Sequence, residues 1–280
     1  MTPKPLNDSD GSVADLIVVS GASGGIGRPL SAAVSRLGRH TVLIGRDQSA
    51  LDETAEGCQG AVRTLQADVS VPESIEAIGA ILDNTHHQRI VVVAGAGVVG
   101  PISPPGLEDP VLWEASINTN LLGVFRLVHP FLDRMRRVGW GRVVAVSSAQ
   151  TLHGPDPVMT SYATAKLAVN AYIACLAAHF AGTGVSACAI HPGDVLTRMG
   201  LEIERKADEA GEAAVHLRQW AHGLAQNGGD DPRRAGELVA EVITRPAVWS
   251  NGRFLLVKQA IERHPMSHWS MDVGPLSDSA

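Results

Sequence analysis

The sequence has few cysteines, no long apolar run and no excess of basic residues. Its three cysteines, Cys58, Cys175 and Cys188, lie far apart without metal-ligand spacing, so we expect free thiols in a reducing compartment and no disulfide framework. No apolar run approaches the roughly 18 residues that a membrane-spanning helix needs. The formal charge of −6, with Lys and Arg interspersed among acids, offers no basic stripe for nucleic acid or anionic lipid. This composition favours a small neutral or apolar partner.

The first fourteen residues also lack the build of a signal peptide. They are polar and contain Pro3 and Pro5 where a signal peptide has a basic stretch followed by an apolar one. We therefore expect a flexible tail over residues 1–14 and a cytoplasmic protein. Because 45% of the 280 residues are apolar, residues 15–280 are enough for one large core, and we expect a single domain there.

From residue 16 onward, short apolar runs rich in Val and Ile alternate with longer segments of helical period. Runs without period-2 alternation are typical of strands buried on both faces, so they predict a parallel sheet with helices on each side. The pattern indicates a doubly wound, Rossmann-type α/β fold in three layers. Helices are predicted to begin near residues 26, 72, 108 and 162, and the clearest strands are 16–20, 41–44, 90–94, 141–147 and 185–191.

The segment 197–229 departs from this alternation. It is long and charged and ends in Asn227-Gly228-Gly229, which predicts a helical insertion with a flexible exit. Ligands in open α/β sheets bind beyond the carboxyl ends of the strands, where an insertion after a late strand is well placed to cover them. We expect a substrate lid, with a pair of solvated surface helices as the alternative. The stretch 264–280 has no assignable structure.

A glycine-rich turn, GASGGIG at residues 21–27, lies between the first predicted strand and the first predicted helix. Glycines 21, 25 and 27 allow a tight turn, a close approach to a pyrophosphate and close helix packing, and the helix start offers free N–H groups to the anion. This position predicts dinucleotide binding, with a glycine-rich connection without ligand as the alternative.

The end of the second predicted strand bears on the choice of dinucleotide. An NAD site usually offers a carboxylate there for the ribose 2′-hydroxyl, whereas this strand ends in Gly45-Arg46. Arg46 can pair with a 2′-phosphate, so we expect NADP(H) in preference to NAD(H). Asp47 comes one residue too late for the ribose and is interpreted as a helix N-cap or turn residue.

Tyr162 and Lys166 stand four residues apart in a segment whose Ala, Leu and Lys content favours a helix, so both project from one helix face. A phenol with a pKa of about 10 is a poor base at neutral pH, but a nearby ammonium stabilises the phenolate and lowers its pKa. Such a phenol can protonate an alkoxide or deprotonate an alcohol. Because the spacing is common by chance, it indicates chemistry only together with other elements.

Those elements are present, and together they resemble the short-chain dehydrogenase/reductase family over residues 15–258. Asp68-Val69 resembles the element that contacts the adenine ring, and INTNLLG at 117–123 contains Asn120 at the position of the catalytic asparagine. GRVVAVSS at 141–148 resembles the fifth strand with its catalytic serine. HPGDVLT at 191–197 resembles the Pro-Gly turn beside the nicotinamide.

The resemblance implies the roles of individual residues. Ser148 hydrogen-bonds the substrate oxygen, Tyr162 is the acid/base, and Lys166 tunes Tyr162 and holds the nicotinamide ribose. Asn120 helps to hold a water for proton relay. The implied cofactor-binding residues are Gly21, Ser23, Gly25, Ile26, Gly27, Arg46, Asp68, Val69, Ala96, Tyr162, Lys166, Pro192, Gly193, Val195 and Thr197.

Two departures from the family pattern matter. The interval from Ser148 to Tyr162 is one residue longer than expected, which suggests an altered substrate loop and leaves Ser147 as a rival for the serine role. After the fourth strand, relatives usually show Asn-Asn-Ala-Gly, whereas this chain has AGAG at 94–97. The loss of both amide side chains is expected to affect local rigidity more than chemistry.

The substrate is the least readable part. Ser148, His153, Met159 and Met199 are predicted to contact it, and Trp220 lies where relatives build the pocket, although Met159, Met199 and Trp220 also fit simple packing. No histidine pair has metal-ligand spacing on one element, so we expect no metal.

The function that follows is an NADPH-dependent ketoreductase or alcohol dehydrogenase, which moves a hydride between nicotinamide and a carbonyl or secondary alcohol of a small, apolar substrate. A non-catalytic NADP-binding regulatory or scaffold protein is one alternative. An imine or conjugated alkene as acceptor is another. The resemblance also implies a homotetramer or homodimer through the helical segments that begin near residues 108 and 162.

Overall fold

The computed structural model describes residues 13–82, 88–154, 156–257 and 262–266. Its strands form one eight-stranded sheet in the order β3-β2-β1-β4-β5-β6-β7-β8, in which β8 pairs antiparallel to β7 and the other neighbours are parallel. The strands are β1 (Ala14–Ser20), β2 (Gly38–Gly45), β3 (Ala61–Gln66), β4 (Ile90–Ala94), β5 (Gly141–Val146), β6 (Val185–His191), β7 (Arg253–Leu256) and β8 (Glu262–Pro265).

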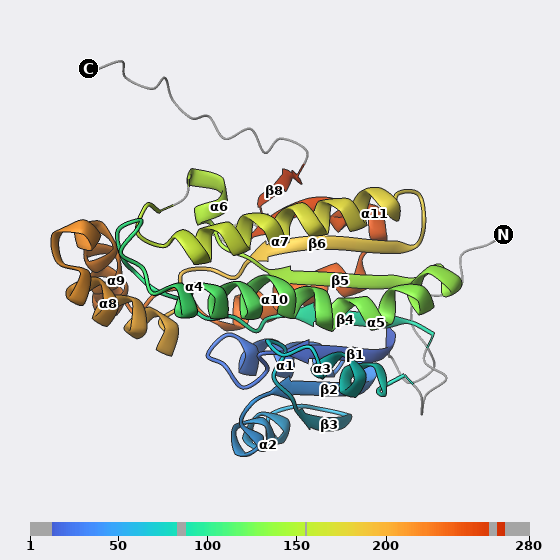
Figure 1. Ribbon diagram of the computed structural model, residues 1–280. Coiled ribbons are helices and arrows are strands. Elements are labelled where there is room, and N and C mark those ends of the chain that lie inside the picture. Colours follow the sequence, from blue (N-terminus) through green and yellow to red (C-terminus); the bar gives the residue numbers. More distant parts are fainter. Residues whose placement is uncertain (1–12, 83–87, 155, 258–261, 267–280) are drawn as a thin grey trace.

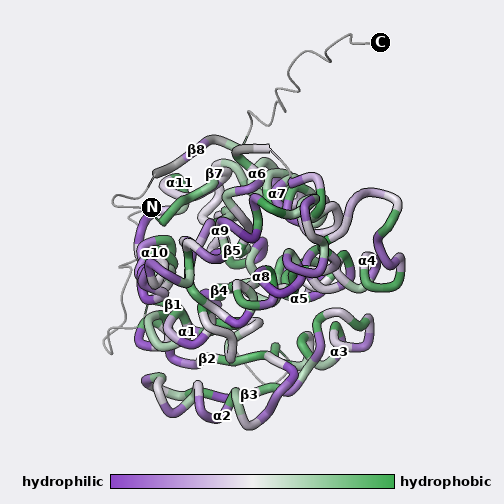
Figure 2. Tube along the Cα trace, turned by 90° about the vertical axis from the view of Figure 1, so that its left-hand side faces the viewer, coloured by the Kyte–Doolittle hydropathy of each residue, from purple (hydrophilic) through white to green (hydrophobic). Residues whose placement is uncertain are grey.

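Helices cover both faces of this sheet (Figures 1 and 2). The α-helices are α1 (Gly27–Ser35), α2 (Gln48–Glu56), α3 (Ser74–Gly79), α4 (Pro110–Ile117), α5 (Gly123–Val138), α6 (Gln150–His153), α7 (Thr160–His179), α8 (Arg198–Ala210), α9 (Val215–Asn227), α10 (Arg233–Thr244) and α11 (Ala247–Ser250). A π-helix, η1 (Asn118–Leu122), joins α4 to α5, and a 3-10 helix, η2 (Gly211–Ala214), joins α8 to α9.

Two apolar cores confirm that the strands are buried on both faces. Leu16 and Val18 of β1 belong to one core, which also contains residues of α5 and α7. Ile17 and Val19 belong to the other, which contains residues of α1 and α10. Successive strand residues point to opposite faces, so an uninterrupted apolar run supplies both cores at once. The predicted three-layer Rossmann-type fold is therefore confirmed.

Element boundaries differ slightly from the predictions. The predicted tail is two residues too long, because Ala14 begins β1 and Val13 is buried; residues 1–12 lie outside the described part. The fifth strand ends at residue 146, one residue before its predicted end. The segment 197–229 is helical as predicted. Of the unassigned stretch 264–280, residues 264–266 are described, and residues 264 and 265 belong to β8.

One buried cation ties β5 to its surroundings. The Arg142 guanidinium donates hydrogen bonds to four backbone carbonyls, two of them, of Val242 and Arg245, at the carboxyl end of α10. Helix ends leave such carbonyls without partners in the helix, and their partial negative charge favours a cation. Burial nevertheless lowers the pKa of Arg142 to about 10. Arg142 thus fixes the amino end of the strand whose carboxyl end carries Ser147 and Ser148.

The parallel strands all end on one side of the molecule, where α8 and α9 lie beyond the sheet (Figure 1). Figure 2 looks onto this side, with α8 and α9 in front of β4 and β5. Chain segments after β1, β4, β5 and β6 therefore meet there. Within the described residues, no helix combines the length and apolarity required to cross a membrane.

Candidate functional site

A cavity of about 550 Å³ lies at the carboxyl ends of β5 and β6, between the connection to α7 and the helices α8 and α9. Its position matches the crevice in which open α/β sheets bind ligands. Nine of the predicted site residues line it, namely Ile26, Ser148, Met159, Tyr162, Pro192, Gly193, Val195, Thr197 and Met199.

Tyr162 lies in the first turn of α7, and its phenol is hydrogen-bonded to Ser148, directly beyond the end of β5. Burial raises the pKa of the Tyr162 phenol, and the bond to Ser148 acts in the opposite direction. Ser147 also lines the cavity, but its hydroxyl is buried and has no partner among the described residues. Of the two serines, Ser148 is the one that affects the pKa of Tyr162.

Lys166 follows Tyr162 by one turn of α7, as the spacing predicts. Its Nζ donates to the carbonyl of Val146 at 2.8 Å and lies 5.6 Å from the centre of the Tyr162 ring. Burial lowers the pKa of Lys166 to about 8. The sequence predicts that the ammonium lowers the pKa of Tyr162. In the structure that pKa is raised instead, because burial outweighs the opposing contribution of Ser148.

Asn120 occupies the π-helix η1 and is fully buried. Its Oδ1 accepts a hydrogen bond from the Val98 N–H at 3.1 Å, while its Nδ2 donates to the Val98 carbonyl at 2.7 Å and to the Ser116 hydroxyl at 3.1 Å. A π-turn inserts one extra residue into a helix and often marks a functional site. Here it turns the asparagine inward, where its amide holds the segment that follows β4.

That segment, AGAG at 94–97, is held from a second side. The Ser20 hydroxyl, at the end of β1, accepts hydrogen bonds from the N–H groups of Gly95 at 3.2 Å and Ala96 at 3.3 Å. A side chain at Gly97 would lie 2.9 Å from Oδ1 of Asn120 and 3.7 Å from Nζ of Lys166. Ser20 and Asn120 therefore brace the loop that lacks the usual asparagines, and its small residues leave room for the buried polar groups.

The glycine-rich turn is crowded in the way that a dinucleotide site requires. Gly21 has a φ of 65°, and a Cβ on it would lie 2.7 Å from the Ala96 nitrogen; a Cβ on Gly27 would lie 2.0 Å from the Gly21 carbonyl oxygen. A Cβ on Gly25 would lie 2.8 Å from Cγ2 of Thr197. The backbone thus forms a cradle that side chains would fill, which fits a bound pyrophosphate.

The loop after β6 closes the cradle from the other side. Gly193 has a φ of 94°, and a Cβ on it would lie 2.8 Å from Oδ2 of Asp230. The same oxygen accepts the Asp194 N–H at 2.8 Å. Thr197 caps the start of α8 and also packs beside Gly25. The loop after β6 and the glycine-rich turn therefore lie against one another.

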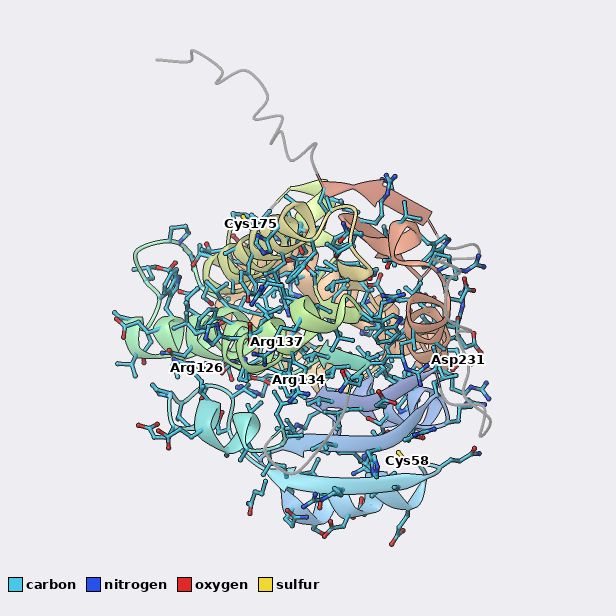
Figure 3. The ribbon with its side chains drawn as sticks, turned by 90° about the vertical axis from the view of Figure 1, so that its right-hand side faces the viewer. Cys58, Arg126, Arg134, Arg137, Cys175 and Asp231 are labelled. Atoms are coloured by element: carbon cyan, nitrogen blue, oxygen red, sulfur yellow. The ribbon has the colours of Figure 1, made fainter. Side chains whose placement is uncertain are left out.

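The remaining predicted cofactor residues lie along the carboxyl ends of β2 and β3. Arg46 is exposed directly after β2, and Asp47 caps α2 by accepting the Ala50 N–H, as interpreted from the sequence. Asp68 accepts the Ser70 N–H at 2.8 Å. The Arg126 guanidinium, projecting from α5 (Figure 3), donates to the carbonyls of Val69 and Ser70 and so holds this connection.

The predicted substrate residues divide into two groups. Met159, Met199 and Trp220 line the cavity, and the side chain of His153 lies outside the described residues.

His191, not predicted as a site residue, lines the cavity and accepts the Ala149 N–H through Nδ1 at 3.3 Å. The remaining lining residues that sequence reasoning missed include Gln150, Asp156, Pro157, Ile203, His216 and Leu217. In the described part of the chain, no three acidic, His or Cys side chains are grouped to hold a metal ion.

An outer apolar cluster joins the helical segment 197–229 to the loops beneath it. It combines residues that follow β4, residues before α7 and residues of α8 and α9. The Tyr162 ring and the Met199 side chain pack against it. This packing explains why Tyr162 is partly buried. The buried members of the outer apolar cluster are Val99, Ile102, Val158, Met159, Ile203, Ala207, Ala214, Leu217 and Ala221.

Fold and site together define a Rossmann-type dehydrogenase or reductase, and comparison with known proteins agrees. A family model described as short chain dehydrogenase matches residues 15–208. The chain is 32% identical over 200 residues to the 3-oxoacyl-[acyl-carrier-protein] reductase FabG of Pseudomonas aeruginosa. The matched region covers 69% of this chain and 78% of that protein. The chain therefore belongs to the short-chain dehydrogenase/reductase family and is an NAD(P)-dependent oxidoreductase.

Two solved structures share the fold. NAD+-bound xylitol dehydrogenase has a TM-score of 0.75 at 21% identity, and the superposed region covers 87% of this chain and 97% of the xylitol dehydrogenase chain. A variant of actinorhodin polyketide ketoreductase with NADPH has a TM-score of 0.74 at 24% identity, and the superposed region covers 89% of this chain and 97% of the ketoreductase chain. The shared fold thus accompanies both dinucleotides, so the choice between them depends on local residues.

Replacement of Gly27 by Ala is expected to disrupt the dinucleotide cradle. The new Cβ would lie 2.0 Å from the Gly21 carbonyl oxygen, so the turn must move, at a cost of about 2 kcal/mol. Titration with NADPH, followed by fluorescence, should show at least tenfold weaker binding. Gly24→Ala is the matched control, because its Cβ would meet the same oxygen at 3.3 Å. Equal affinity of the two variants would contradict the assignment.

Replacement of Lys166 by Met is expected to stabilise the fold near pH 7. A lowering of the lysine pKa from 10.5 to about 8 corresponds to about 3 kcal/mol of cost for burying the charge. The lost hydrogen bond to Val146 offsets about 1 kcal/mol of the gain, which leaves about 2 kcal/mol in the free energy of unfolding.

The pH dependence of this gain has a definite sign. Below about pH 8 the ammonium is charged in both the folded and the unfolded chain, so the cost is fully present; it fades as the pH rises and is gone above about pH 10.5. Urea unfolding near pH 7 and near pH 10 measures the difference. Lys206→Met provides the contrast: it removes a partly exposed ammonium that pairs with Glu202 and donates to the Gly100 carbonyl, so it should lower stability near pH 7. A Lys166→Met variant that is less stable than wild type near pH 7 would refute the prediction.

Proposed function

We propose that this enzyme uses NADPH to reduce the carbonyl group of a small ketone with an apolar body. The observation that carries the proposal is the hydrogen-bonded Tyr162 and Ser148 pair on the wall of a largely apolar cavity, next to the glycine cradle. A bound nicotinamide dinucleotide supplies the hydride that adds to the carbonyl carbon. The protein supplies position and the proton.

The cradle residues can each be assigned to one part of a dinucleotide. The glycine-rich turn would hold the pyrophosphate, the ends of β3 and β4 the adenosine, and the loop after β6 the nicotinamide. Tyr162 and Lys166 would face the nicotinamide ribose. The residues proposed for these contacts are Gly21, Ser23, Gly25, Ile26, Gly27, Asp68, Val69, Ala96, Pro192, Gly193, Val195 and Thr197.

Tyr162 and Ser148 are the groups proposed to act on the substrate oxygen. Both hydroxyls can donate to it, which polarises the carbonyl, and the Tyr162 phenol then gives its proton to the oxygen. Because burial raises the pKa of Tyr162, the phenol is protonated at neutral pH, which suits reduction. Lys166, whose pKa is about 8, still carries its charge there and stabilises the phenolate that forms. Asn120 keeps the loop beside Lys166 in place.

The preference for NADP(H) rests on the end of β2. The only nearby carboxylate in sequence, Asp47, is engaged in capping α2, whereas Arg46 is exposed and follows β2 directly. An exposed guanidinium at this point suits a 2′-phosphate, which it can bind with two parallel hydrogen bonds.

A homo-oligomer is proposed through the face formed by α4, α5 and α7. Val111 is 73% exposed, and Leu112 and Phe125 are also exposed; Phe125 contacts the ring of Tyr172 from α7 edge-on. A surface of exposed apolar side chains over several helices supports contact with a second copy.

The three cysteines are free thiols, which supports a reducing, cytoplasmic setting.

The non-catalytic alternative loses its motivation in this structure. It rested on the absence of both asparagines after β4, but Ser20 and Asn120 brace that loop. Analysis of products with ketone, imine and enone substrates separates carbonyl reduction from the other acceptors.

Tyr162→Phe tests the proposed chemistry. Removal of the acid should lower kcat/KM for ketone reduction by at least 100-fold, since general acid catalysis contributes about 10² to 10⁴, while NADPH binding is retained. The chain has one other tyrosine, Tyr172, which lies on the same helix outside the cavity, so Tyr172→Phe is the matched control. Equal rates for wild type and Tyr162→Phe would rule out the assigned role.

Arg46→Ala tests the choice of cofactor. Loss of a charge-assisted contact with the 2′-phosphate should raise the Kd for NADPH about tenfold or more and leave the Kd for NADH unchanged. Arg36→Ala, which removes an exposed arginine at the end of α1, is the control. If both Kd values changed equally, Arg46 would not distinguish the dinucleotides.

A further inference from the structure

Two side chains meet at the solvent boundary of the cavity. Asp156 lies in the connection between α6 and α7, and His216 lies in the first turn of α9; both line the cavity. The carboxylate of Asp156 accepts a hydrogen bond from Nε2–H of His216 at 2.5 Å. The pair therefore joins the loop that leads to Tyr162 with the helical segment 197–229.

Asp156 is the fixed member of the pair. Its side chain is 9% exposed, whereas that of His216 is 49% exposed. The other carboxylate oxygen accepts the Val158 N–H at 3.0 Å, and the Asp156 carbonyl accepts the Met159 N–H at 3.2 Å. The carboxylate is thus aimed by its own turn, and His216 brings α9 to it.

The pair continues an apolar contact between the same two walls. Val158 and Met159 belong to the outer apolar cluster together with Leu217, the residue after His216. A second polar tie connects α8 to the segment after β4, where Nζ of Lys206 donates to the Gly100 carbonyl at 2.6 Å. The wall formed by α9 is therefore held at its base by packing and at its rim by one hydrogen-bonded pair.

We propose that Asp156 and His216 determine substrate size: their hydrogen bond fixes the α9 wall and restricts the cavity to compact, uncharged carbonyl compounds. This inference rests on the proposed function. Most of the neighbouring lining side chains are apolar, namely Met159, Met199, Ile203, Leu217 and Trp220, and Gln150, whose amide contacts the Met159 sulfur, carries no charge.

The strength of the pair is sufficient for such a role. A partly exposed, charge-assisted hydrogen bond shifts an equilibrium by about tenfold. Loss of the pair would favour an outward displacement of α9 by that factor and admit larger ketones. Catalytic groups would be unaffected, because neither Asp156 nor His216 contacts Ser148, Tyr162 or Lys166 through any hydrogen bond in the described structure.

The test compares His216→Ala and Asp156→Asn with wild type. Asp156→Asn keeps the size and the acceptor for the Val158 N–H but removes the charge, so its effect should be intermediate. His222→Ala is the matched control, because His222 lies on the same helix, contacts Gln226 and does not line the cavity. The measurements are kcat/KM for cyclohexanone and for benzophenone, and amide hydrogen exchange over residues 198–227.

We expect His216→Ala to lower the ratio of kcat/KM for cyclohexanone to that for benzophenone at least tenfold and to speed exchange in α9 about tenfold, while His222→Ala changes neither. An unchanged ratio or unchanged exchange in His216→Ala would overturn the inference. If wild type reduced neither ketone, the proposed function would fail for this substrate class, and the exchange rates alone would still decide whether the pair holds the wall.

Discussion

Backbone crowding at the carboxyl ends of β1, β4 and β6 is the constraint on which the site depends. The turn after β1 approaches the loop after β4 so closely that a Cβ on Gly21 would lie 2.7 Å from the Ala96 nitrogen, and a Cβ on Gly25 would meet Thr197 from the loop after β6. Three segments distant in sequence thus share one small volume. Since only glycine permits these approaches, the glycine spacing sets the position of these three segments relative to one another.

Burial then decides the chemistry of the charged and titratable groups in this volume. The outer apolar cluster covers Tyr162 and leaves its phenol in the protonated form at neutral pH, and burial brings the pKa of Lys166 to about 8. Both groups are held by few, specific hydrogen bonds, from Ser148 and to Val146. The site therefore holds a lysine at a cost to stability, as expected where a buried charge serves a reaction.

The sequence predicts most of this arrangement, and the exceptions have physical causes. Unbroken Val and Ile runs reveal the five strands buried on both faces, whereas β3 is half exposed and β7 and β8 have four residues each, which leaves little pattern to read. Helical periodicity does not reveal the π-turn at Asn120. The pairing of Asp156 with His216 spans 60 residues. Neither the lysine spacing nor the motif order shows that burial raises the pKa of Tyr162.

We propose that this cavity directs hydride to a carbonyl carbon while Tyr162 supplies the proton. The most direct measurement uses NADPH with deuterium at the transferable position of the nicotinamide ring, acetophenone as acceptor, and mass spectrometry of the product. If hydride passes from NADPH to the carbonyl carbon, we expect an alcohol with one deuterium on its carbinol carbon for each NADPH oxidised. NADPH oxidation that leaves the alcohol without deuterium, or yields no alcohol, would contradict it.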